Sequence, residues 1–169
     1  ILSEQYLKPI DGNLKPDKNA LENTDAVEKT LDLFDIPEEL ENLTFKELMR
    51  ETYKDMRYSL FSNSGYKYNP SVVNDDFVFD SDTIIVIKDP FKILYKDSLN
   101  KEKVHVFVRG IKFELNNFQC IKDVIDEINE GQEIAVGQLF DILDEDWDMD
   151  IKQYILNLFY KHNGIKIVN

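Results

Sequence analysis

The chain has little of the material from which catalytic and metal sites are usually built. Its 169 residues contain one cysteine and two histidines, so an internal disulfide is excluded and a reducing compartment is indicated. The six glycines are scattered singly, without the spacing of dinucleotide-binding or phosphate-binding loops. No apolar run approaches the roughly 18 residues that a membrane helix needs. These absences predict a soluble, cytoplasmic protein with no membrane segment.

The residues that could most readily do chemistry have ordinary structural explanations. His105 lies in a predicted strand, and neither it nor His162 belongs to a His-x-Asp or His-x-Glu pair that would suit a facial iron triad. Cys120 lies on a predicted helix, where packing explains it better than reactivity does. A carboxylate enzyme that uses residues such as Glu114 and Asp123 has no geometric support in the sequence. We therefore predict no catalytic, cofactor-binding or metal-binding residue and no cofactor in this chain.

Acidic residues dominate the composition. There are 33 acids against 20 bases, which gives a formal net charge of −13. Between Asn117 and Tyr154 eleven residues are acidic, and only Lys122 and Lys152 are basic. Because nucleic-acid-binding modules usually present a basic patch, we predict that nucleic acid is not a partner.

The N-terminal portion, residues 1–65, is predicted to be helical. Residues 1–18 show no periodic pattern, and a first helix is indicated over 19–34 by a capping residue and apolar spacing. Thr44 and Glu47 have the spacing of a capping box, with Leu43 and Leu48 at the staple positions. This signal predicts a second helix that begins at Thr44 and continues to Leu60.

An apolar stripe runs along this second helix at intervals of three or four residues. It consists of Phe45, Leu48, Met49, Tyr53, Met56 and Leu60. Such a stripe packs against another apolar surface, which can belong to the same chain or to a second copy. The second possibility predicts a homodimer formed through these residues.

Residues 66–82 are predicted to be a linker, because aromatic residues stand among Asn, Pro, Ser and Asp without a regular period. After it, residues 83–87 and 91–95 are β-branched and aromatic runs separated by Lys88, Asp89 and Pro90, which predicts two strands joined by a tight bend. A second pair, 104–108 and 111–115, flanks Arg109 and Gly110, a two-residue hairpin loop in which glycine tolerates positive φ. We expect a small antiparallel sheet here.

Three short apolar-periodic segments follow, 118–128, 136–143 and 151–159, and a short alternating stretch over 165–167 comes after Gly164. The order helix, helix, helix and strand is typical of a winged helix. The predicted fold class is therefore α+β. It comprises a helical portion over 1–65, a linker over 66–82, and a β-hairpin with a winged-helix-like domain over 83–169.

The connection between the second and third of these helices is strongly acidic. Asp144, Glu145 and Asp146 form its acidic loop. A calcium site is excluded, because the glycine that makes its sharp turn is absent. We predict instead that Asp146 or Asp148 caps the third helix and that Trp147 folds back onto the core.

This order of elements resembles the C-terminal part of the bacterial JmjC, or cupin-type, ribosomal protein hydroxylases. The resemblance rests on the helices over 19–34 and 44–60, the hairpin over 104–115 and the end over 160–165. In that family an iron(II) and 2-oxoglutarate oxygenase domain comes first, and a helical dimerisation domain and a winged helix with an acidic surface follow. The family's iron ligands have no counterpart here, so the resemblance implies that such activity belongs to a domain upstream. A start at isoleucine rather than methionine fits that expectation.

We therefore predict a non-catalytic interaction module that self-associates and binds a protein partner. The acidic loop would receive a basic protein, such as a ribosomal protein, because complementary charges speed encounter. The alternative is a stand-alone winged-helix regulator that contacts DNA through Lys152, Gln153, Asn157 and Lys161.

Overall fold

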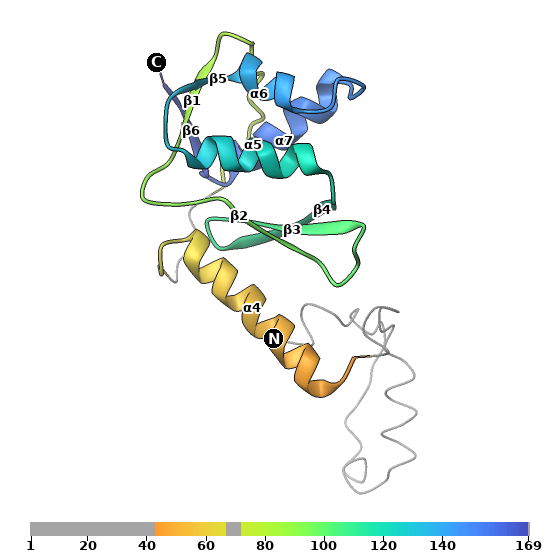
Figure 1. Cartoon of the computed structure of the whole chain (residues 1–169). Helices are drawn as coiled ribbons and strands as arrows, with labels where there is room; N and C mark the ends of the chain where they lie inside the picture. Colours follow the sequence, from red (N-terminus) through yellow and green to blue (C-terminus); the bar gives the residue numbers. More distant parts are fainter. Residues whose placement is uncertain (1–42, 67–71, 169) are drawn as a thin grey trace, which may run out of the picture. The chain divides into compact units, whose positions relative to one another are not determined.

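The structure, a computed structural model, describes residues 43–66 and 72–168. Within them it contains four helices and two three-stranded antiparallel sheets (Figure 1), so the predicted α+β class is confirmed. The chain divides into two compact units, residues 1–52 and 53–169. The division falls inside helix α4 (Phe45–Ser62), and each unit is described by itself. The predictions for residues 1–18 and for a helix over 19–34 lie outside the described residues.

Helix α4 begins and ends where its sequence predicts. The N–H of Thr44 donates to Oε2 of Glu47 at 2.9 Å, and the N–H of Glu47 donates to Oγ1 of Thr44 at 3.3 Å, which is the predicted capping box. At the other end the N–H of Gly65 donates to the carbonyl oxygen of Leu60 at 2.8 Å. Gly65 has a φ of 81°, the left-handed conformation that commonly closes a helix. None of the helices in the described ranges is both long and apolar enough to cross a bilayer.

Strands β2 (Leu94–Asp97), β3 (Lys103–Val108) and β4 (Ile111–Asn116) form one sheet with β3 in the middle. The predicted hairpin is confirmed, because Val108 pairs with Ile111 across Arg109 and Gly110. Both loop residues have positive φ, 49° and 86°, as a type I′ turn requires. Side chains alternate along β3: Val104, Val106 and Val108 join the hydrophobic core, while His105 and Phe107 face α4.

Strands β1 (Ile84–Ile87), β5 (Ile134–Ala135) and β6 (Ile165–Val168) form the other sheet, in the order β5-β1-β6. The two strands predicted over 83–87 and 91–95 are present as β1 and β2, but they do not pair with each other. Strand β1 has β5 on one edge and β6 on the other, so β2 pairs with β3 in the separate sheet. The strand beside β6 therefore comes from upstream of all three C-terminal helices.

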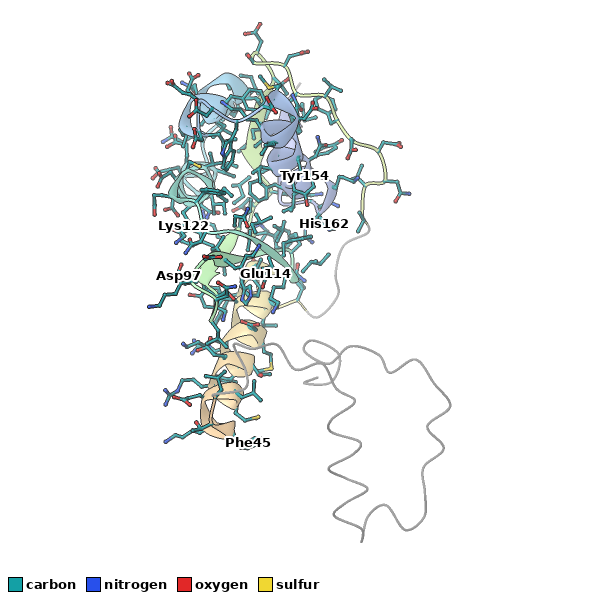
Figure 2. The ribbon with its side chains drawn as sticks, turned by 90° about the vertical axis from the view of Figure 1, so that its right-hand side faces the viewer. Phe45, Asp97, Glu114, Lys122, Tyr154 and His162 are labelled. Atoms are coloured by element: carbon teal, nitrogen blue, oxygen red, sulfur yellow. The ribbon has the colours of Figure 1, made fainter. Side chains whose placement is uncertain are left out.

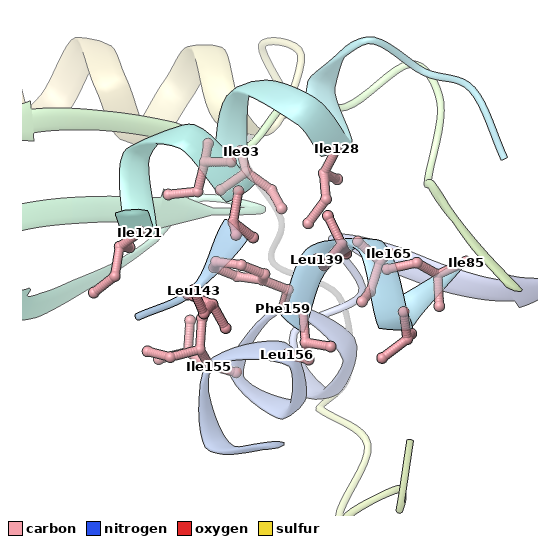
Figure 3. Packing of buried hydrophobic residues seen from close by; sticks show 14 of the residues in the cluster. Ile85, Ile93, Ile121, Ile128, Leu139, Leu143, Ile155, Leu156, Phe159 and Ile165 are labelled. Atoms are coloured by element: carbon pink, nitrogen blue, oxygen red, sulfur yellow. The ribbon is translucent and has the colours of Figure 1, made fainter. Parts of the chain in front are cut away.

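The three predicted C-terminal helices are present as α5 (Gln119–Asn129), α6 (Val136–Ile142) and α7 (Met149–Lys161). Their apolar faces meet the inner faces of both sheets in one core, shown in Figure 3, which holds Ile93, Ile128, Leu139, Phe159 and Ile165. The order of α5, β5, α6, α7 and β6 has the helix, helix, helix and strand that the sequence predicts. The winged-helix interpretation itself stays a prediction.

Candidate interaction surfaces

The predicted apolar stripe lies on an outer face of α4. In the first unit Phe45 (labelled in Figure 2) and Met49 are exposed, and Leu48 is half-buried. In the second unit Tyr53, Met56 and Leu60 are exposed, with 56%, 53% and 41% of their surfaces accessible. Five of the six predicted residues therefore present large apolar side chains outward.

The opposite side of α4, in the second unit, is buried through a charged residue. Asp55 is only 3% exposed. Its carboxylate lies 2.6 Å from Nζ of Lys96 on β2 and 2.8 Å from Nζ of Lys112 on β4. Burial by itself would raise the pKa of Asp55, but the hydrogen bonds and charges of Lys112 and Lys96 outweigh it and lower the pKa below its usual value. The carboxylate therefore stays ionised and holds this part of α4 on the sheet.

His105 belongs to the same cluster. Its Nε2 lies 3.2 Å from Oε2 of Glu114, and its Nδ1 lies 3.8 Å from Oδ1 of Asp55. Burial lowers the pKa of His105, with the charge of Lys112 acting in the same direction, and these effects outweigh the two carboxylates. The residue is thus a packed core histidine, with Phe107 in edge contact at 6.5 Å between ring centroids.

Tyr58 and Ser62 complete the buried side of α4. The Tyr58 ring lies 5.3 Å from that of Phe107, and the N–H of Gly110 donates to Oγ of Ser62 at 3.0 Å. Beside this contact lies a shallow groove of about 460 Å³. It is lined by Lys54, Arg57, Tyr58, Phe61 and Leu94.

An extended segment, residues 72–82, lies along α7. We call it the strap. Asn157 accepts from the N–H of Phe77 at 2.8 Å and donates to its carbonyl oxygen at 2.9 Å. Gln153, one turn earlier, accepts from the N–H of Phe79 at 3.0 Å and donates to its carbonyl oxygen at 2.7 Å. Two side-chain amides on one helix face therefore hold alternate residues of the strap, as a neighbouring strand would. The strap is the described part of the segment predicted to be a linker.

The four polar residues of α7 that were predicted to contact bases in the DNA-binding alternative all have partners within the chain. Gln153 and Asn157 hold the strap. Lys152 is 9% exposed and donates from Nζ to the carbonyl oxygen of Phe140 at 3.0 Å. Lys161 pairs with Asp76 of the strap at 2.8 Å. The polar face of α7 is directed at the chain itself.

The acidic loop is exposed at all three positions. Oδ1 of Asp144 accepts from the N–H of Asp146 at 3.0 Å, which shapes the loop. Asp148 stands at the N-cap position of α7, but its side chain makes no capping hydrogen bond, so the predicted side-chain cap by Asp148 is wrong. Trp147 packs on the core and meets the Phe118 ring at 5.1 Å, as predicted.

A groove of about 480 Å³ lies between the strap and the first turns of α7. Val78, Met149 and Tyr154 expose 76%, 54% and 60% of their surfaces there, and Tyr154 projects from α7 in Figure 2. Asp76 and Asp150 supply its charge. The full lining is Asp76, Phe77, Val78, Met149, Asp150, Gln153, Tyr154 and Asn157. We refer to it as the strap groove. It was not predicted, because the pairing of strap and helix is non-local.

The remaining reactive side chains stand apart from one another. Burial lowers the pKa of His162, helped by the charge of Lys161, and the centroid of its ring lies 4.7 Å from that of Phe113 in a tilted contact. Cys120 is half-buried against the core. Within 43–66 and 72–168 no three His, Cys, Asp or Glu residues are grouped so that they could hold a metal ion. The predicted lack of a cofactor stays a prediction.

Comparison with models of known protein families gives no match, and comparison with curated proteins gives none either.

Proposed function

We propose that this chain is an interaction module that self-associates through α4 and binds a basic protein partner. The observation that carries the proposal is that α4 buries polar side chains and exposes apolar ones. Its buried side includes Asp55 and Ser62, whereas Tyr53, Met56 and Leu60 are exposed. An apolar helix face directed outward is what a helix-to-helix interface uses.

Burial of these side chains in an interface favours association. Full burial of a large apolar side chain contributes on the order of 1.5–3 kcal/mol, and Tyr53, Met56 and Leu60 of the second unit still expose 56%, 53% and 41% of their surfaces. Over two copies their gain is comparable to the lower part of the cost of association, which is about 4–15 kcal/mol.

Light scattering on a size-exclusion column tests this part of the proposal. The wild-type chain should elute as a dimer, and Met56→Lys or Tyr53→Ser should shift it toward monomer. Leu99→Ser, which changes an exposed apolar residue outside α4, on the loop between β2 and β3, is the matched control and should leave the dimer intact. A wild-type chain that is monomeric at all accessible concentrations would remove self-association from the proposal.

The second part of the proposal concerns the partner. The exposed acidic loop and the net charge of −13 favour a basic protein, of which a ribosomal protein tail is one example. Charge reversal of Asp144, Glu145 and Asp146 to lysine should slow association with such a protein. Unchanged association would count against this surface.

The alternative, a regulator that contacts DNA through α7, has less support. Gln153 and Asn157 hold the strap, and the ammonium groups of Lys152 and Lys161 meet partners within the chain. A helix directed at DNA keeps such groups available for phosphates and bases. Salt-dependent binding to duplex DNA at low ionic strength would reverse this preference.

We also propose a relation to the JmjC-type hydroxylases. A helical region that self-associates, followed by three helices and a short strand with an acidic surface, fits the C-terminal part of that family. On this view the chain supplies assembly and partner contacts to an oxygenase domain. Finding a cupin segment with iron-ligand histidines in the same polypeptide would support the relation, and a parent protein that lacks one would oppose it.

A further inference from the structure

We propose that the strap groove is the anchoring site of the basic partner, and that it takes an extended peptide in which cationic and apolar side chains alternate. This inference rests on the proposed function and gives it a site and a ligand class.

The first argument is the apolar character of the groove. Met149 and Tyr154 stand on α7, and Val78 stands on the strap, with more than half of each side chain's surface accessible. Three large apolar groups exposed around one hollow are unusual on a surface as charged as this one. An apolar or aromatic side chain of a peptide would cover them.

The second argument is the charge around the hollow. Asp76 and Asp150 line it directly, and the two segments that flank it, residues 72–82 and 141–151, contain no lysine or arginine. Of the two lysines of α7, only Lys161 pairs with one of these carboxylates. Lys152 points inward to the carbonyl oxygen of Phe140, and Lys161 pairs with Asp76 at 2.8 Å, so neither ammonium group is directed at Asp150. A peptide with lysine or arginine side chains matches this field.

The third argument is rigidity. Two amides, Gln153 and Asn157, fix the strap at Phe77 and Phe79, and the rings of Phe77 and Phe79 contact each other and Tyr160. The wall of the groove is therefore formed before any ligand arrives. A preformed groove loses less conformational entropy on binding than a loop that must order.

The test uses the full chain and a fluorescein-labelled peptide in which lysine alternates with leucine and tyrosine, followed by fluorescence anisotropy at low ionic strength. Tyr154→Ala, which changes no charge, and Asp150→Lys should each weaken binding by about tenfold. Ile151→Ala, on the same helix but outside the groove, and Glu127→Lys, an exposed acid of α5, are matched controls that should change binding by less than about twofold. The methyl resonances of Val78 and Met149 should shift on titration.

Three outcomes would overturn the proposal. Equal weakening by Glu127→Lys and Asp150→Lys, with no effect of Tyr154→Ala, would show diffuse attraction without a site. Equal binding of a peptide with glutamate in place of lysine would remove the charge argument. Conversion of the chain to monomer by Tyr154→Ala would assign the groove to a second copy. Because self-association is measured separately on α4 variants, failure of the groove and failure of the proposed function remain distinguishable.

Discussion

Asn157 of α7 and Phe77 of the strap form a closed pair of hydrogen bonds, amide to peptide, at 2.8 and 2.9 Å. The side chain of a helix thereby satisfies both backbone groups of a residue eighty positions earlier. Asn157 is 7% exposed, so water has little access to replace it.

Replacing Asn157 by leucine should therefore destabilise the chain. The N–H and C=O of Phe77 would lose their partners in a part-buried site, which costs about 1–3 kcal/mol in the free energy of unfolding. Urea denaturation measures the loss, and amide hydrogen exchange at Phe77 should accelerate. Asn157→Asp keeps the acceptor and loses the donor, so its stability should lie between those of the wild-type chain and the leucine variant. A leucine variant as stable as wild type would mean that the strap does not depend on the hydrogen bonds of Asn157.

Removing the carboxylate of Asp55 should be more damaging. Lys96, whose side chain is 9% exposed, would lose the carboxylate that lies 2.6 Å from its ammonium group, and breaking a buried pair in this way costs about 3–5 kcal/mol. Asp55→Ala should lower the urea midpoint accordingly. The double variant Asp55→Leu with Lys96→Met removes both charges and should recover much of the loss, whereas an additive loss would contradict the coupling.

The lowered pKa values of the two histidines predict that the folded chain becomes less stable toward unfolding in acid. The folded pKa values of His105 and His162 lie below the ordinary value of 6.5, mainly because both rings are buried. As the pH falls below 6.5 the unfolded chain takes up protons before the folded chain does, so the free energy of unfolding decreases. Urea midpoints measured above and below this pH should show the decrease, and His162→Gln should make it smaller. Asp55, whose folded pKa is lowered from 3.8, adds a further loss only at more acidic pH.

Gly164 should not tolerate a side chain. A Cβ at this position would lie 2.7 Å from Cγ1 of Val108 and 3.2 Å from the carbonyl oxygen of Phe159, so Gly164→Ala should cost about 1–3 kcal/mol through overpacking. Thermal unfolding followed by circular dichroism measures the cost. Combining it with Val108→Ala removes the closest contact, and the pair should be less destabilised than the two single losses added together.

Local signals predicted local structure well in this chain. The capping box at Thr44 and Glu47, and the two-residue turn at Arg109 and Gly110, fix backbone geometry within a few residues, and both are present. The three C-terminal helices were also predicted within two residues of their observed ends, because their apolar period reflects the core that they share.

Non-local pairing could not be predicted from the same signals. Nothing in the run Ile84–Ile87 indicates that β5 and β6 would take its two edges, and β5 is too short to show alternation. The stripe on α4 was found, but the burial of Asp55 on the opposite side depends on lysines from two distant strands. The strap groove depends likewise on amides that meet the strap only after folding.

The position of β1 has a consequence for how the chain can be divided. Strand β1 precedes α5 in sequence, yet it supplies the middle of the sheet whose other strands lie within the C-terminal helical region. A fragment that begins after the hairpin would keep all three helices and lose the strand that joins β5 to β6. We therefore expect that the C-terminal helices do not fold as a separate fragment, and that the shortest fragment able to fold begins before Ile84.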